Sequence, residues 1–392
     1  MPLLSLRLEN FRLVGRANIE LAPGINLFWG DNAQGKTTVL EAAGMLATGR
    51  SFRTARDREC IGWGAGEQRV GAVEGVFTAG PSRHEVRVAI EPSRKAVWLD
   101  RKPLRALSEL WGLFRTVFFV PADLGLIQGP PQQRRAALDT LLSQSQPAYL
   151  QTLVGMTRAL ASRNGLLRRH VPPTDPQYDA FEKTLAVSAA RTMLARARLA
   201  ERLTEATRVT MAEITGGTEE LALVYEAGFG TASGIGALCA AGTPADELAA
   251  ELLALWRRAR KGDLERGVTR EGPHRDDLRF EIGGHDARSY ASQGQTRSAV
   301  LALRLAELDL LAGLDPGRPP VLLLDDILGE LDAGRAERFL NLVAKRQVQT
   351  LMTATGAAIV EATLPVERRF CLEKGNVTPD RETPGADRSG GQ

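Results

Sequence analysis

Residues 24–38 read Gly-Ile-Asn-Leu-Phe-Trp-Gly-Asp-Asn-Ala-Gln-Gly-Lys-Thr-Thr, an apolar stretch that leads into a complete phosphate-binding loop of the form G-x-x-x-x-G-K-[ST]. Its glycines let consecutive backbone N–H groups turn toward phosphates. Lys36 adds a cation near the β- and γ-phosphates, and Thr37 offers a hydroxyl to Mg²⁺. The flanking residues predict a strand before the loop and a helix after it, whose positive end faces the same anion. The predicted nucleoside triphosphate site consists of Gly30, Asp31, Asn32, Ala33, Gln34, Gly35, Lys36, Thr37 and Thr38.

The composition of the whole chain is that of an ordinary globular protein with room for two or three domains. It has 392 residues, a net charge of +3, three cysteines and four histidines. Neither the cysteines nor the histidines have metal-ligand spacing, and an odd number of cysteines argues against a disulfide framework. No apolar run could span a membrane, and the N-terminus lacks a secretion-signal pattern. We therefore expect a cytoplasmic protein with no membrane partner.

The chain contains two kinds of sequence pattern, one typical of strands and one typical of helices. Short alternating runs predict strands in the first part, including an antiparallel meander at 69–77, 84–91 and 95–99. An Ala-, Leu- and Arg-rich stretch then predicts helices over 147–169 and 177–215, which a short proline-rich loop should join as an antiparallel pair. The prediction is an α/β nucleotide-binding domain in two halves (1–131 and 268–374), an inserted helical arm lobe (132–267) and a disordered tail (375–392).

A second acidic element predicts the metal side of the nucleotide site. Val321-Leu-Leu-Leu-Asp-Asp326 has four apolar residues followed by two carboxylates. A buried parallel strand that carries acids only at its carboxyl end is the physical form of a Walker B element. Asp325 would then orient Mg²⁺, and Asp326 would polarise the attacking water. We predict Asp326 and Lys36 as the catalytic residues and Thr37 and Asp325 as the metal ligands.

A second anion site is predicted at Ser292-Gln-Gly-Gln-Thr-Arg297, just before an apolar helix at 298–311. A small hydroxyl residue and a glycine at a helix N-terminus combine a hydroxyl donor, exposed N–H groups and the helix dipole. One chain does not need two such helix starts for one nucleotide. The economical interpretation is that Ser292, Gly294 and Gln295 grip a nucleotide held by another copy of the chain.

These motifs occur in the order found in ABC-type ATPase heads, which the chain resembles. More narrowly, it resembles the RecF family of bacterial recombination mediators, which is related to SMC heads. The resemblance extends from about residue 3 to 373, and a Gly-Pro-His-Arg-Asp-Asp run and a double arginine are its most specific parts. The matching segments are Glu9-Asn-Phe-Arg12, Gly49-Arg-Ser-Phe-Arg53, Pro121-x-Asp-Leu, Gly129-Pro-Pro-x-x-Arg-Arg135, Leu-Asp139, Gly272-Pro-His-Arg-Asp-Asp277 and Leu324-Asp-Asp-x-x-x-Glu-Leu-Asp332.

The resemblance implies an SMC-like ABC head with a mixed sheet and an arm lobe. It also implies ATP and Mg²⁺ as cofactors, and a head-to-tail homodimer with two ATP molecules between protomers. Asp332 would lie at the dimer seam, and Asn10 and Arg12 would approach the adenine. The implied function is DNA binding and recombinase loading in recombinational repair, replication-fork maintenance and the SOS response, with RecR- and RecO-type mediators as partners.

The chain departs from the usual ABC pattern at three positions. Asp326 stands where many ABC proteins carry the longer glutamate. The usual switch histidine is missing after the strand that follows, where Thr353 or Thr355 could substitute, and Gln128 is the nearest candidate for a glutamine loop. These departures predict slow hydrolysis, with ATP acting as a dimerisation switch.

The predicted DNA contact comes mainly from the resemblance, with modest support from arginines on the predicted helices. Each cluster is equally compatible with a solvated helical face balanced by glutamates. We expect contact to the backbone of a duplex, or of a duplex–single-strand junction, that depends on salt. Arg50 and Arg53 could face DNA or the partner's nucleotide. The helical candidates are Arg158, Arg163, Arg168, Arg169, Arg191, Arg196, Arg198, Arg202, Arg208, Arg257, Arg258, Arg260 and Lys261.

Four classes of protein compete to explain the motifs. A transporter ATPase would carry a switch histidine and a clear glutamine loop. A nuclease-linked or long-coil SMC relative would need a second acidic cluster or hundreds of heptad residues. A P-loop kinase would leave the segment at 292–297 unexplained. A DNA-binding ATPase is therefore preferred, and an ATPase subunit of another ABC or SMC-type machine is the alternative.

Overall fold

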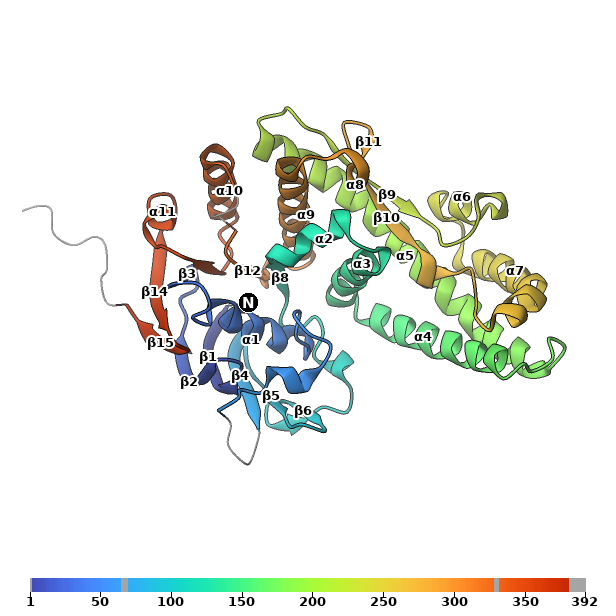
Figure 1. The fold of residues 1–392 in the computed structure, drawn as a ribbon, viewed down its shortest axis with the longest axis horizontal. Helices are drawn as coiled ribbons and strands as arrows, with labels where there is room; N and C mark the ends of the chain where they lie inside the picture. The colour runs from blue at the N-terminus through green and yellow to red at the C-terminus, as the bar shows by residue number, and fades with distance from the viewer. Residues whose placement is uncertain (1, 65–69, 328–330, 381–392) are drawn as a thin grey trace, which may run out of the picture. The chain divides into compact units, whose positions relative to one another are not determined.

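The computed structural model describes residues 2–64, 70–327 and 331–380 of the chain. It divides into two compact units, one formed by Met1–Pro121 with Leu311–Gln392 and the other by Ala122–Leu310 (Figure 1). We call them the sheet unit and the helical unit. The sequence had suggested boundaries at 131/132 and 267/268, so residues 122–131 and 268–310 lie in the helical unit instead of the nucleotide-binding halves.

A largely parallel sheet organises the sheet unit, with strand order β15-β14-β3-β13-β12-β8. Its central strands β3, β12 and β13 are short apolar runs whose residues are almost all buried, as expected for a parallel sheet covered on both faces. The strands are β3 (Ile25–Trp29), β8 (Thr116–Phe119), β12 (Val321–Leu324), β13 (Thr350–Ala354), β14 (Val366–Glu373) and β15 (Asn376–Pro379).

Strand β15 departs from the predicted disordered tail, which began at residue 375. It pairs antiparallel with β14, and this backbone pairing orders residues whose composition carries no apolar periodicity. Residues 381–392 of the predicted tail lie outside the described residues.

The second sheet of this unit is antiparallel, with order β2-β1-β4-β5-β6-β7. Its middle strands confirm the predicted meander. Helix α1 (Lys36–Thr48) packs against strands of both sheets, and Thr37 is its only residue that is not buried. The strands are β1 (Leu3–Phe11), β2 (Val14–Glu20), β4 (Gly71–Ala79), β5 (Ser82–Ile90), β6 (Lys95–Leu99) and β7 (Lys102–Pro103). The other helices of this unit are η1 (Asp57–Cys60), η2 (Leu107–Glu109), α10 (Ala333–Arg346) and α11 (Ala358–Glu361).

The helical unit contains the two long helices that the sequence predicted, α4 (Pro147–Arg168) and α5 (Pro176–Thr215). They pack against each other, with Met156 and Ala159 in one apolar cluster with Leu185 and Ala189 (Figure 1). Both begin with a proline at the first turn, where its missing N–H costs nothing. The other helices are η3 (Pro121–Leu124), α2 (Gly125–Gln128), α3 (Pro131–Ser145), η4 (Thr231–Ser233), α6 (Ile235–Ala240), α7 (Ala245–Arg266), η5 (Pro273–Arg275) and α8 (Ala287–Tyr290).

A small antiparallel sheet also belongs to the helical unit, in the order β11-β10-β9. Strand β9 (Leu221–Glu226) lies within the stretch predicted to be helical, and it pairs with β10 (Asp277–Ile282) beyond helix α7. Strand β11 (His285–Asp286) and helix α9 (Gln293–Leu314) follow. Within residues 2–64, 70–327 and 331–380, no helix has the length and hydropathy of a membrane span.

Candidate nucleotide-binding site

The phosphate-binding loop connects β3 to α1 and has the backbone geometry that its glycines predict. Gly30 and Gly35 have φ angles of 150° and 104°, and Ala33 has a φ of 63°. A Cβ atom on Gly30 would lie 2.4 Å from the carbonyl oxygen of Leu372 on β14, so neither the conformation nor the packing admits a side chain there. The loop is therefore fixed against the edge of the parallel sheet.

The lysine of the loop lies over its own backbone. Lys36 Nζ donates to the carbonyl oxygens of Gly30 (2.5 Å) and Asp31 (3.0 Å), and the residue is 6% exposed. Two further bonds tie the loop to the turn after β14. The backbone N–H of Lys374 donates to the Gln34 side chain, and that of Gly375 donates to its carbonyl. The cation is thus held inside the ring of backbone that would surround a phosphate.

Asp325, directly after β12, joins the two halves of the site. The Thr37 hydroxyl donates to its two carboxylate oxygens at 2.9 and 2.8 Å. Thr353 on the neighbouring strand β13 donates to Asp325 Oδ1 at 2.8 Å and accepts the Asp326 backbone N–H at 2.8 Å. The structure therefore brings the predicted metal ligands Thr37 and Asp325 into contact, and it places the Thr353 hydroxyl within hydrogen-bond distance of Asp325.

The environment of Asp325 balances opposing effects. Burial raises its pKa, the Asp326 carboxylate raises it further, and the hydrogen bonds from Thr37 and Thr353 lower it. A hydroxyl and a carboxylate are hard oxygen donors of the kind that hold Mg²⁺ beside a nucleotide. Among the described residues, no group of three or more His, Cys, Asp or Glu side chains forms an all-protein metal site. The residues present thus fit a magnesium ion that nucleotide phosphates help to ligate.

Asp326 takes a left-handed backbone conformation with a φ of 47°, and it is half-buried. Residues 328–330, including Gly329 and Glu330 of the predicted turn, lie outside the described residues. Asp332 is described: its side chain accepts the Arg335 backbone N–H at 2.9 Å and caps α10.

A buried carboxylate on α1 escaped the sequence analysis. The Glu41 side chain is fully buried and lies one helical turn after Thr37. It binds the guanidinium groups of Arg12 and Arg53, at 2.6 and 3.2 Å. The one available signal was a charged residue within the apolar run Val-Leu-Glu-Ala-Ala-Gly-Met-Leu.

The predicted second anion site forms the start of α9 in the helical unit. The Gln295 backbone N–H donates to the Ser292 hydroxyl at 3.2 Å, and the Ser292 N–H donates to the Gln295 side chain at 2.9 Å. This reciprocal pair is a capping box. Ser292 is exposed, and Gly294 and Gln295 are half-buried. The local geometry is thus a capped helix N-terminus with an accessible hydroxyl.

Comparison with known proteins identifies the family. A family model described as an AAA domain matches residues 5–102. The DNA replication and repair protein RecF of Chloroflexus aurantiacus is 38% identical, over 95% of this chain and 98% of that protein. That of Symbiobacterium thermophilum is 38% identical, over 97% and 99%. The chain belongs to the RecF family.

Solved structures agree with this assignment. A structure of the recombination mediator protein RecF, described as RecF-ATP in the RecFOR pathway, has a TM-score of 0.84 and 29% identity, covering 96% of this chain and 97% of that one. An Smc head bound to the C-winged helix domain of ScpA has a TM-score of 0.55 and 15% identity, and shares the fold. The α/β fold of RecF and SMC heads, an ATPase-family fold, is therefore that of this chain.

The two segments on which the resemblance to the RecF family depended most specifically, the Gly-Pro-His-Arg-Asp-Asp run and the double arginine, lie in the helical unit. Asp276 of the Gly-Pro-His-Arg-Asp-Asp run is 1% exposed, and its carboxylate accepts from Arg196 (2.8 Å), Tyr225 (2.5 Å) and the Gly228 N–H (2.7 Å). Arg196 also forms a bidentate pair with Asp139. Despite this pairing, burial raises the pKa of Asp276. This cluster joins α3 and α5 to the turn that precedes β10.

The double arginine of the family pattern completes that cluster. Arg134 pairs with Asp277 through two hydrogen bonds of 2.6 and 2.9 Å, and it also donates to the carbonyls of Leu126 and Gly129. Arg135 donates to the carbonyl of Asp276. Arg134 is therefore structural, since its charge is paired with Asp277 inside the protein, whereas Arg135 contacts only backbone there.

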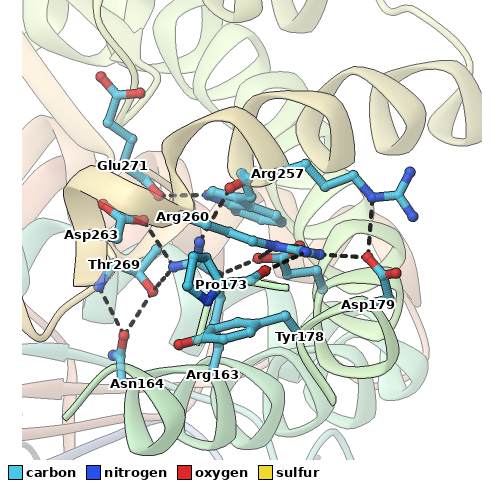
Figure 2. A network of polar contacts seen from close by, with 12 residues as sticks. Arg163, Asn164, Pro173, Tyr178, Asp179, Arg257, Arg260, Asp263, Thr269 and Glu271 are labelled. Carbon is cyan, nitrogen blue, oxygen red and sulfur yellow. Dashed lines mark hydrogen bonds and ion pairs between the residues drawn. The ribbon is translucent and has the colours of Figure 1, made fainter. Parts of the chain in front are cut away.

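A second ionic cluster joins the C-terminal part of α4, the N-terminal part of α5 and the C-terminal part of α7 (Figure 2). Arg163 is completely buried and binds Glu182 and Asp263, each at 2.9 Å. Arg260 binds Glu182 and Asp179, and its guanidinium lies 5.4 Å from the centre of the Tyr178 ring. The structure thus corrects the view of these arginines as DNA contacts.

Three of the arginines considered for DNA, Arg163, Arg196 and Arg260, are therefore occupied by internal carboxylates. Sequence could not separate them from the others, because their partners come from distant helices. The remaining candidates are exposed on the helical unit. They are Arg158, Arg168, Arg169, Arg191, Arg198, Arg202, Arg208, Arg257, Arg258 and Lys261.

Proposed function

We propose that this chain binds ATP with Mg²⁺, closes with a second copy around the nucleotide, and holds DNA while recombinase is loaded. The contact between Thr37 and Asp325 carries this proposal, since it joins the phosphate loop to the acidic strand end at 2.8 Å. The relatives and the RecF-ATP structure described above support the assignment of ATP and of a role in DNA replication and repair.

In this proposal each residue of the nucleotide site has a separate role in ATP hydrolysis. The backbone N–H groups of Gly30–Thr37 bind the phosphates, and Lys36 moves from its own loop carbonyls to them. Mg²⁺, bound through Thr37 and Asp325, would neutralise charge on the phosphates. Asp326 polarises the attacking water. Its short side chain places the carboxylate farther from that water than a glutamate would, so we propose slow hydrolysis.

The helix start at Ser292, Gly294 and Gln295 completes the site in trans. Its accessible hydroxyl and the positive end of the long helix α9 suit the γ-phosphate of a nucleotide held by the partner. The nucleotide then acts as a switch, because the dimer is complete only while the triphosphate is intact.

The DNA contact is proposed for the exposed arginines of the helical unit. Arg191, Arg198 and Arg202 are spaced by seven and four residues along α5, so they lie on one face of that helix. Such a row suits phosphates along a duplex or a duplex–single-strand junction and would bind without sequence preference. Cooperation with RecR- and RecO-type mediators, support of stalled forks and the SOS response, and a cytoplasmic location remain part of the proposal.

The proposal is tested by sedimentation velocity of the full chain with and without ATP and a short duplex. We expect an ATP-dependent dimer that Asp326→Asn prolongs and that Ser292→Arg and Lys36→Ala abolish. Replacing Arg191, Arg198 and Arg202 together by Ala should reduce the slope of log affinity for DNA against log salt by about 3, one per lost phosphate contact. A chain that stays monomeric with a non-hydrolysable ATP analogue and DNA would overturn the proposed switch.

A further inference from the structure

Arg115 directly precedes strand β8 and is a buried arginine of the sheet unit. The residue is 8% exposed, and its Nε and Nη1 atoms are shielded from solvent and make no hydrogen bond with any residue in the ranges 2–64, 70–327 and 331–380. Its backbone is paired, since its carbonyl oxygen accepts the Val321 N–H at 2.9 Å. Shielded donors of a charged group are costly to leave unpaired. An anion at this side chain would remove that cost.

The charges that act on Arg115 come from the turn between α9 and β12. In this turn the Arg318 backbone N–H donates to the Asp315 carbonyl at 2.9 Å, and Arg318 Nε pairs with Asp315 Oδ2 at 2.5 Å. Burial lowers the pKa of Arg115, the charge of Arg318 lowers it further, and the Asp315 carboxylate raises it. Two guanidinium groups beside one carboxylate leave a net positive charge. One further negative charge would balance this group.

The pair between Arg318 and Asp315 can yield to a competing anion. The two side chains are 34% and 30% exposed, and an exposed ion pair contributes little to stability. Arg318 can therefore turn from Asp315 to an added ligand at small cost, while the buried Arg115 stays in place.

The position of this group separates it from the nucleotide site. Arg115 and the turn precede strands β8 and β12, which pair in parallel, whereas Asp325 and the phosphate loop follow β12 and β3. Parallel strands align their ends, so the two sites lie at opposite edges of the sheet. An anion at Arg115 is therefore a ligand other than the nucleotide bound at the phosphate loop.

We propose that Arg115 and Arg318 bind a small oxyanion, of the carboxylate or phosphate class, at the edge of the parallel sheet opposite to the phosphate loop. Arginine suits such a ligand because its planar guanidinium can donate two parallel hydrogen bonds to a carboxylate or a phosphate. A DNA backbone fits less well, since it requires a row of exposed cations, whereas Arg115 is buried and Asp315 repels further phosphates. The inference concerns a second site and does not depend on the proposed function.

Equilibrium dialysis of the full chain against radiolabelled phosphate tests this site. Every chain compared carries Lys36→Ala, which weakens phosphate binding at the loop. The second changes are Arg115→Met, Arg318→Ala and, as the matched control, Arg105→Ala, because Arg105 is an exposed arginine of the same unit. We expect a phosphate bound with a Kd of about 1 mM, weakened about tenfold or more by each of the first two changes. The control should stay within about twofold of the chain with Lys36→Ala alone.

The Tm of the same chains gives a readout that a merely structural arginine would not move. Without an oxyanion, Arg115→Met should leave the Tm unchanged or raise it, because methionine fills the space without an unpaired charge. Phosphate at about ten times the Kd should raise the Tm by about 3 °C only where Arg115 is present. A Tm that does not respond to phosphate in any chain would overturn the inference. If Arg115→Met does not fold, Arg318→Ala decides, and phosphate binding equal to that of the control refutes the site.

Competition distinguishes the source of the oxyanion. Acetate, a short glutamate peptide and a short duplex are each added to the chain with bound phosphate. Displacement by acetate and the peptide at equal carboxylate concentration supports a free small ion as the ligand, and displacement by the peptide at a much lower concentration supports an acidic side chain of a partner protein. Displacement by the duplex that requires Arg115 would show a DNA backbone contact and would overturn the assignment to a small oxyanion.

Discussion

Exchange of Arg196 for methionine should destabilise the helical unit, although Arg196 was a candidate for DNA contact. The side chain is 2% exposed and serves two carboxylates at once, Asp139 and Asp276. Methionine keeps most of the volume but none of the donors, so both acids would remain inside with their negative charge unbalanced.

The expected loss can be estimated from the contacts that remain. Removing one partner of a buried ion pair costs about 3–5 kcal/mol. Here one guanidinium serves two acids, but Asp139 keeps the Tyr149 hydroxyl and Asp276 keeps Tyr225. We therefore expect a loss of about 4 kcal/mol in the free energy of unfolding of this unit. The loss should shrink as the pH falls, because burial already raises the pKa of Asp276 and protonation removes its charge.

Hydrogen exchange followed by mass spectrometry measures this effect locally. A loss of about 4 kcal/mol should reduce the protection of the α5 and β10 amides by roughly a thousandfold. Arg198→Ala is the matched control, because Arg198 lies two residues away and is exposed. Its effect should stay within about 0.5 kcal/mol. Equal protection in both variants would show that the Arg196 ion pairs do not stabilise the fold.

Two further predictions concern the nucleotide site and the pH dependence of stability. Thr353→Val leaves Asp325 with one hydroxyl donor fewer, so the Mg²⁺ affinity measured in titrations of ATP binding should fall about tenfold. Thr350→Val on the same strand is the control, and equal affinities would refute the reasoning. Burial lowers the pKa of His274 from 6.5, so its stabilising effect is present above that pH and is lost as the pH falls through the lowered value. Between about pH 8 and pH 5.5 the unchanged chain should lose more Tm than His274→Gln, and a parallel decline would contradict this.

The sheet unit could be largely predicted from sequence because each of its signals is local. The apolar run of β3, the glycine loop and α1 follow one another directly, and the run of β12 ends in its two acids. Parallel strands align their carboxyl ends at one edge of a sheet, so the contact between Thr37 and Asp325 follows from topology alone. Thr353 could be proposed for the same reason.

The helical unit was less predictable because its specificity depends on partners distant in the sequence. Arg163 and Arg158 lie on the same helix and look alike in sequence, yet one is buried against Asp263 and the other is exposed. Strand β9 was missed because the pattern Leu-Ala-Leu-Val-Tyr-Glu is short, and only its pairing with β10 selects a strand. Glu41 was missed because burial of a charge depends on the arginines that come to meet it.

The residues on which the resemblance to the RecF family depended most specifically lie outside the nucleotide site, in the ion pairs of the helical unit. A phosphate loop is shared by many ATPases, since any triphosphate requires the same backbone donors. The cluster of Asp139, Arg196 and Asp276 satisfies itself internally, and each member is costly to change while the others remain. Removing one member of this set leaves a charge of the others unbalanced inside the protein. The ion pairs of Asp139, Arg196 and Asp276 therefore indicate how the helical unit is stabilised, whereas the phosphate loop indicates which chemistry the protein performs.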